Sequence, residues 1–109
     1  MGMTGERLDA DEALRIRLVD EVATDAEAGM DRAMALADMV SRRSPTAVAT
    51  YKSAVLAGQE LDRAAARDLE GRAYEHCLDS GDAAIGRADF KRITAGESVD
   101  WNPRKPFGD

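Results

Sequence analysis

The stretch LDRAAARDLEGRAYEHC, residues 61–77, decides the class of fold. Its apolar residues recur at strict intervals of four: Leu61, Ala65, Leu69, Ala73 and Cys77. Residues four apart lie above one another on the same face of an α-helix, so this spacing predicts a long amphipathic helix. Gly58 precedes the stretch as a break in the chain, and charged residues fill most of the positions between the apolar ones.

Two more helices are predicted before this stretch. Ser44-Pro45 marks the start of one, because Ser is favoured at an N-cap and Pro at the first helical position. Its apolar stripe comprises Val48, Tyr51 and Val55. The segment Thr24-Asp25-Ala26-Glu27 has the capping pattern that opens the other helix. The apolar face of that helix comprises Ala33, Leu36, Ala37 and Val40.

Shorter elements are predicted towards both ends of the chain. Asp9-Ala10-Asp11-Glu12 repeats the capping pattern, so a short helix is expected over about 10–16. Residues 18–22 form a short, partly β-branched run, which we expect to be extended. Asp82 follows a Ser-Gly break and is expected to cap a fifth helix that continues to about Ile93.

The helical pattern stops after residue 94, and two prolines block a regular helix beyond it. The sequence therefore predicts an all-α fold of about five helices, with one short extended segment near the N-terminus. The predicted organisation is a helical region over residues 1–94 and an irregular tail over residues 95–109.

The composition restricts the classes of function. The 109 residues are 44% apolar but only 5% aromatic, and the net charge is −6. Such a core buries little area per residue, so stability is expected to depend on a partner or on oligomerisation. Scattered basic residues argue against nucleic-acid binding, and no apolar run approaches the roughly 20 residues of a membrane span. With one cysteine and no signal-peptide core, we expect a cytoplasmic protein.

Three stretches resemble the enoyl-CoA hydratase/isomerase (crotonase) family. Residues 4–22, TGERLDADEALRIRLVDEV, are similar to a family segment that has Thr-Gly, then Ala-x-Glu-Ala and Gly-Leu-Val. Ser44-Pro45, followed by Ala47 and Lys52, resembles the family's Ser-Pro-x-Ala helix with its later Lys. Residues 80–90, SGDAAIGRADF, resemble its Ser-x-Asp, Glu-Gly and Ala-Phe stretch. The order and intervals of the three indicate the C-terminal part of a family member.

The resemblance implies that the family's catalytic half is missing from this chain. In family members an N-terminal spiral domain carries the oxyanion hole and the acidic residues that move protons, while the C-terminal helices assemble trimers and close the acyl-CoA pocket. It implies a homo-oligomer, or a catalytic N-terminal partner chain. It also implies a coenzyme A thioester as the substrate of the assembled enzyme, with no tightly bound cofactor.

Departures from the family pattern fall at two structural positions. Arg17 stands where the family usually has Gly, at a point where a helix ends in the left-handed conformation. That conformation costs a residue with a side chain roughly 1–2 kcal/mol. Ile85 stands where the family usually has Glu.

The resemblance also implies a binding site for the CoA nucleotide. Its candidate residues are Phe90, Lys91, Arg92 and Lys105. Phe90 is expected either in the core or against the adenine. The family places a phosphate-binding Lys three residues after this Phe, where the chain has Ile93. Lys91 and Arg92 come one or two positions early, which turns them by roughly 100–200° on a helix.

Other candidate chemistry has simpler explanations. His76 and Cys77 are neighbours, and neighbours on a helix diverge by about 100°, so they cannot form a nucleophile–base pair with each other. We expect Cys77 to be a buried inert thiol and His76 a surface or interface residue. The first-turn carboxylates are explained by capping. No catalytic residue and no metal ligand is predicted.

Two functions follow as hypotheses. The first is the C-terminal segment of an enoyl-CoA hydratase/isomerase-like protein of fatty-acid metabolism, which supplies subunit contacts and part of the pocket lid and is not catalytic alone. The second is a free-standing helical oligomerisation or interaction module without activity. For the tail, contact with a partner subunit or with a CoA phosphate and a tail without structure are equal alternatives; the residues concerned are Trp101, Arg104, Lys105 and Phe107. A reading frame for a spiral domain directly upstream would favour the first hypothesis.

Overall fold

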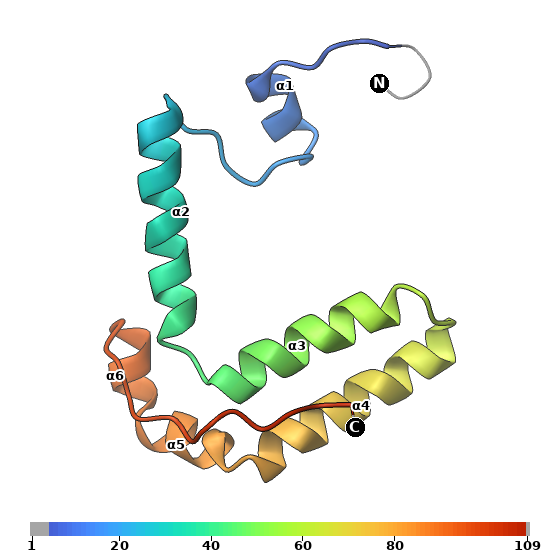
Figure 1. The fold of residues 1–109 in the computed structure, drawn as a ribbon, viewed down its shortest axis with the longest axis vertical. Helices are drawn as coiled ribbons and strands as arrows, with labels where there is room; N and C mark the ends of the chain where they lie inside the picture. The colour runs from blue at the N-terminus through green and yellow to red at the C-terminus, as the bar shows by residue number, and fades with distance from the viewer. Residues whose placement is uncertain (1–4, 109) are drawn as a thin grey trace. The chain divides into compact units, whose positions relative to one another are not determined.

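A computed structural model describes residues 5–108 of the chain (Figure 1). In order, its helices are α1 (Ala10–Arg15), α2 (Ala26–Ser41), α3 (Pro45–Gly58), α4 (Arg63–Asp79), α5 (Asp82–Ala88) and α6 (Phe90–Thr94). No strand occurs within these described residues, so the prediction of an all-α fold is confirmed. Residues 18–22 form bends and coil where we predicted an extended segment.

The chain divides into two compact units. The first contains the residues up to Leu36 and the second those from Ala37 onward. In the second unit, α3 and α4 form an antiparallel pair, and α5 and α6 continue from the end of α4 (Figure 1). This unit holds the predicted site residues and the small core.

Four helices begin at a side-chain cap. The caps of α1 and α3 are the predicted ones, the cap of α2 lies within the predicted segment 24–27, and the cap of α4 was not predicted. Asp9, Asp25 and Ser44 each accept a hydrogen bond from the backbone N–H three residues on, at 2.8–2.9 Å. Asp62 accepts from the N–H groups of Ala64 and Ala65, both at 2.9 Å. Each cap satisfies donors that a helix N-terminus leaves without an intrahelical partner.

Helix α1 ends in a left-handed residue that is not glycine. Arg17 has φ +60°, and its N–H donates to Leu14 O at 3.0 Å. The next N–H, from Leu18, donates to Ala13 O at 2.9 Å. These two bonds form a Schellman motif, in which glycine is the preferred residue at the left-handed position. The structure therefore places Arg17 in the strained, left-handed conformation that the family resemblance implies for this position.

Arg17→Gly is expected to stabilise the end of α1 by about 0.5–1 kcal/mol, because it removes left-handed strain from an exposed position. Amide hydrogen exchange at Leu18 should slow by about two- to fivefold. Arg15→Gly, placed inside α1, is the matched control and should speed the same exchange. Equal effects from the two variants would contradict a specific strain at residue 17.

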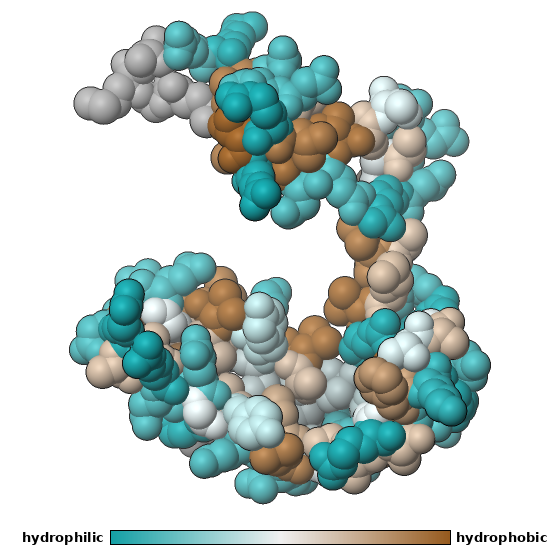
Figure 2. Space-filling view, turned by 180° about the vertical axis from the view of Figure 1, so that it is seen from behind, coloured by the Kyte–Doolittle hydropathy of each residue, from teal (hydrophilic) through white to brown (hydrophobic). Residues whose placement is uncertain are grey.

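The buried core lies between α3 and α4 and is small. Its apolar members are Ala54, Leu69 and Ala73, and Phe107 of the tail packs against them. Thr46 and Thr50 are the largest fully buried side chains among the described residues. Figure 2 shows many apolar side chains at the surface, including a cluster on the N-terminal unit. An apolar surface of this kind is typical of a chain that packs against further protein.

The predicted fifth helix is two helices, and Asp82 does not cap it. Gly81, with φ +85°, occupies the N-cap position, and Asp82 is the first helical residue. Helix α5 ends before Asp89, whose φ of −101° and ψ of +18° interrupt the regular geometry before α6. The prediction for Asp82 was wrong because its carboxylate binds residues distant in the sequence.

Candidate functional site

Three of the four predicted nucleotide-binding residues lie together on α6. Phe90 is 64% exposed, so the alternative of a core position is wrong for the described chain. Phe90, Lys91 and Arg92 line a surface hollow of about 280 Å³. Both Lys91 and Arg92 are exposed beside the ring. Arg87 and Asp89 line the hollow as well, so it combines one aromatic face with three cations and one carboxylate.

Arg92 is already paired with carboxylates. Its guanidinium donates to Glu97 at 3.1 Å and to Asp89 at 3.0 Å. The hydrogen bonds that Arg92 donates to these two carboxylates, the one to Glu97 first, raise the pKa of Arg92 above its ordinary value. Lys91 forms neither an ion pair nor a side-chain hydrogen bond among the described residues, so it is the more available cation for a phosphate.

Lys105 lies on other elements. Its backbone N–H donates to Thr46 Oγ1 at 3.0 Å, at the start of α3. Its Nζ donates to Asp79 O at 2.8 Å, at the end of α4. A cation at this position satisfies a helix C-terminal carbonyl. These two hydrogen bonds place Lys105 with α3 and α4, apart from the α6 cations.

A buried polar cluster, which the sequence did not reveal, joins three segments. Asp82 is 4% exposed and accepts a hydrogen bond from the Ser44 hydroxyl. Its other oxygen accepts from Asn102 N at 3.1 Å and Asn102 Nδ2 at 2.9 Å. Asn102 Nδ2 also donates to Ser80 O at 3.1 Å. We call Ser44, Ser80, Asp82 and Asn102 the clasp, because they hold the tail to the starts of α3 and α5.

The rest of the tail packs on the same unit. Trp101 Nε1 donates to Arg42 O at 2.9 Å, and the ring of Phe107 lies 5.3 Å from that of His76. Figure 1 shows the tail, in red, running along α5 and α4. The tail has no helix or strand, yet it is bonded to the helices of its own chain. From the sequence, the alternatives for the tail are contact with a partner subunit, contact with a CoA phosphate, and no structure.

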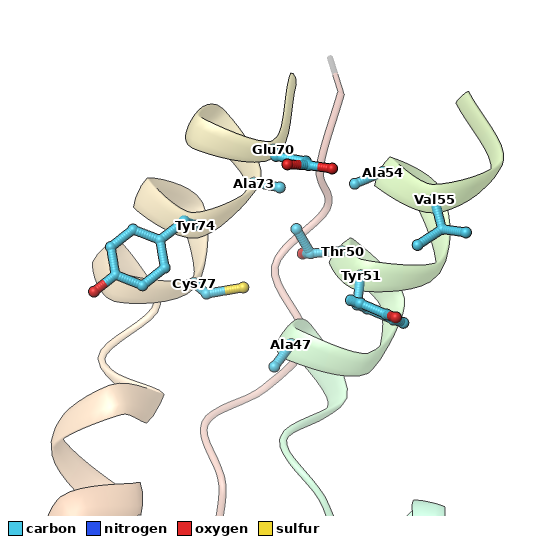
Figure 3. Close-up of a pocket in the computed structure, with 9 residues that line it drawn as sticks. All are labelled: Ala47, Thr50, Tyr51, Ala54, Val55, Glu70, Ala73, Tyr74 and Cys77. Atoms are coloured by element: carbon cyan, nitrogen blue, oxygen red, sulfur yellow. The ribbon is translucent and has the colours of Figure 1, made fainter. Parts of the chain in front are cut away.

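An apolar groove of about 450 Å³ lies between α3 and α4 (Figure 3). Its lining residues are Ala47, Thr50, Tyr51, Ala54, Val55, Glu70, Ala73, Tyr74 and Cys77. Cys77 is only half-buried there, so the prediction of a buried thiol was wrong. The Thr50 hydroxyl is buried and has no hydrogen-bond partner. His76, the neighbour of Cys77 on α4, contacts Phe107 and Lys105 of the tail.

Residues 5–108 contain no group of three or more His, Cys, Asp or Glu residues arranged to hold a metal ion. None of their helices is long and apolar enough to cross a membrane. The side chains that the structure brings together are suited to binding: an aromatic ring with cations on α6, and an apolar groove between α3 and α4.

Comparison with known proteins gives consistent matches. The chain is 35% identical over 88 residues to the Bacillus subtilis protein YngF, named as an enoyl-CoA hydratase/isomerase, with 81% of this chain and 34% of that protein covered. It is 34% identical over 79 residues to a short-chain-enoyl-CoA hydratase of Clostridium acetobutylicum, covering 72% of the chain and 30% of the relative. It is also 34% identical over 91 residues to the human mitochondrial enoyl-CoA hydratase domain-containing protein 2, covering 81% and 31%.

These matches confirm the resemblance seen in the sequence. The chain belongs to the enoyl-CoA hydratase/isomerase family, as a segment that spans about a third of the length of these relatives. No family model matches the chain, and no solved structure matches it.

Proposed function

We propose that this chain is the helical C-terminal segment of an assembly that processes acyl-CoA. In this assembly it supplies subunit contacts and part of the lid over the acyl-CoA pocket. The family membership supports a CoA thioester as the substrate of this assembly. The observation that carries the proposal is the hollow on α6, where Phe90, Lys91 and Arg92 offer a stacking face and cations to a nucleotide.

The catalytic groups of the assembly lie outside residues 1–109 in this proposal. The relatives are about three times as long as the region that they share with this chain. The exposed apolar side chains of α2, among them Met30 and Met34 at 64% and 63%, give the segment a surface for the remaining part. Hydratase or isomerase chemistry then takes place in the assembled protein, in the cytoplasm.

The alternative is a free-standing oligomerisation module without activity. The apolar groove between α3 and α4 favours the oligomerisation module, because protein contacts through this groove would not require a CoA site. Co-expression distinguishes the two functions. If a reading frame for a spiral domain lies upstream, its product is expressed together with this chain and the two are purified. Co-purification of the two chains would support the acyl-CoA assembly, and a pure homo-oligomer would support the module.

Replacing Lys91, Arg92 and Lys105 together with Ala is expected to weaken CoA binding by the assembled protein about ten- to hundredfold. Charge-assisted contacts to phosphate contribute about 1.5–3 kcal/mol, which corresponds to that range of affinity. Isothermal titration with CoA measures the change. The oligomer should remain intact, because these side chains are exposed or lie in the tail.

The matched control removes three other exposed cations, Arg7, Arg63 and Arg72. It changes the net charge equally, so any loss of affinity from long-range attraction alone would appear in both triple variants. Unchanged CoA affinity in the α6 and tail variant would exclude a ligand role for these cations.

A further inference from the structure

The hollow on α6 contains a further cation, Arg87, from the last turn of α5. Its side chain is exposed and forms no ion pair or side-chain hydrogen bond among the described residues. The lining holds three cations, Arg87, Lys91 and Arg92, and one carboxylate, Asp89, which gives it a net charge of +2. The whole chain carries −6. A local positive charge on an acidic protein favours an anionic ligand at this place.

Arg92 is the cation of the hollow that is least free to bind such a ligand. Its guanidinium donates to Glu97, Asp89 and Ser98 O at 3.0–3.1 Å, and these bonds use all three of its nitrogens. Two of the three acceptors are carboxylates, which oppose the approach of another anion. The other two cations of the lining are therefore the ones available to a ligand.

A ring beside two free cations suits a nucleoside that carries a phosphate close to its base. Phe90 is 64% exposed, so its ring is accessible for stacking on a base. Arg87 precedes Phe90 by three residues, so their Cα atoms are at most about 11 Å apart. The long side chain of Arg87 covers much of that distance. A phosphate on the ribose of a stacked base would thus lie within reach of Arg87 and of Lys91.

We propose that Arg87 binds the ribose 3′-phosphate of CoA and makes the hollow prefer CoA to its 3′-dephospho form. The inference rests on the proposed CoA site and names the group of the nucleotide that this chain recognises. A guanidinium donates two parallel hydrogen bonds to one phosphate, a geometry that a Lys ammonium does not offer. Lys91 adds a second positive charge beside it.

The two free cations complement the 3′-phosphate better than the other anions available. The 3′-phosphate is a monoester, which carries about −1.5 to −2 charges at pH 7 on three terminal oxygens. The pyrophosphate, on the 5′ carbon of the ribose, divides its charge between two phosphorus centres and continues into the pantetheine chain. A protein carboxylate carries a single charge and no planar base for the ring. The 3′-phosphate with its adenine therefore satisfies both the cations and the ring.

Titration of the full chain with CoA and with 3′-dephospho-CoA tests the inference. All residues of the hollow lie within 87–92, so the chain can be measured by itself, with NMR signals of the Phe90 and Lys91 amides as the report. The unmodified chain is expected to bind CoA about tenfold more tightly than 3′-dephospho-CoA. In Arg87→Ala this ratio should fall to about two, while 3′-dephospho-CoA binds as before. Unchanged binding of that ligand also shows that the variant is folded.

Arg67→Ala is the matched control. Arg67 is exposed on α4 and lies outside the hollow, and its replacement changes the net charge by the same amount. The tenfold preference should persist in this variant. Arg87→Lys should show an intermediate preference, because it keeps the charge but loses the paired hydrogen bonds.

The possible failures separate this inference from the proposed function. If both nucleotides bind equally at α6, or if the preference survives in Arg87→Ala, the role of Arg87 is wrong and the CoA site stands. If neither nucleotide at millimolar concentration shifts the α6 signals, the role of Arg87 and the nucleotide site are both wrong. An acidic segment of a partner would then be the better ligand for these cations.

Discussion

Asp82→Ala is expected to lower the free energy of unfolding of the second unit by about 2–4 kcal/mol. The buried carboxylate accepts hydrogen bonds from the Ser44 hydroxyl and from two N–H groups of Asn102. Each hydrogen bond to a charged group contributes about 1.5–3 kcal/mol, and donors left buried without a partner add a desolvation cost. The variant removes the acceptor of three clasp hydrogen bonds and leaves the one from Asn102 Nδ2 to Ser80 O, so the tail should be held less firmly to the starts of α3 and α5.

Urea denaturation followed by circular dichroism, at one protein concentration, measures the loss. Asp79→Ala is the matched control, because Asp79 is exposed three residues earlier and its change should stay within about 0.5 kcal/mol. Asp82→Asn should fall between the two, since it keeps one acceptor oxygen but turns an amide towards existing donors. Equal stability of the Asp82 and Asp79 variants would show that the clasp contributes nothing.

The chain of 109 residues alone is expected to hydrate enoyl-CoA no faster than a buffer blank. By the family resemblance, the oxyanion-hole donors belong to the spiral region, which these residues do not include. One such donor typically contributes 10²–10³-fold in rate. Among the described residues, the carboxylates mainly cap helices or form surface ion pairs. Asp9 caps α1 and Asp62 caps α4.

A spectrophotometric assay of enoyl-CoA hydration measures this expectation. A control preparation from the same host, carrying an unrelated protein of similar size, corrects for host hydratases. The expectation would be contradicted by hydratase activity above this control that co-elutes with the chain in two independent purification steps. Activity that appears only on adding the spiral region of a relative would support the assembly.

The sequence predicts local features well because their causes are local. The caps at Asp9 and Ser44 depend on a residue and the N–H three positions on, so a short pattern contains all the information. The left-handed conformation at Arg17 was implied by the family resemblance, in which a Gly usually stands at this position. The identity of the family also came from short motifs, and the comparisons confirm it.

Features that depend on long-range contacts were missed. Asp82 looked like a cap by its position, but its partners lie 38 residues before it and 20 residues after it. The fate of the tail was undecided because Trp101 bonds to Arg42, 59 residues away. Contacts of this kind cannot be predicted from hydrophobic periodicity or composition, because they form only when the helices pack together.

The clasp also imposes an order on folding during synthesis. Translation runs from the N-terminus, so the helices of the second unit leave the ribosome before Asn102 and Phe107 do. Until then the Asp82 carboxylate lacks two of its donors and the core lacks its aromatic member. The contacts that complete the unit are also among its most distant in sequence, which slows their formation. A nascent chain halted before residue 101 therefore has the α3 and α4 pairing but lacks the tail contacts that complete the unit.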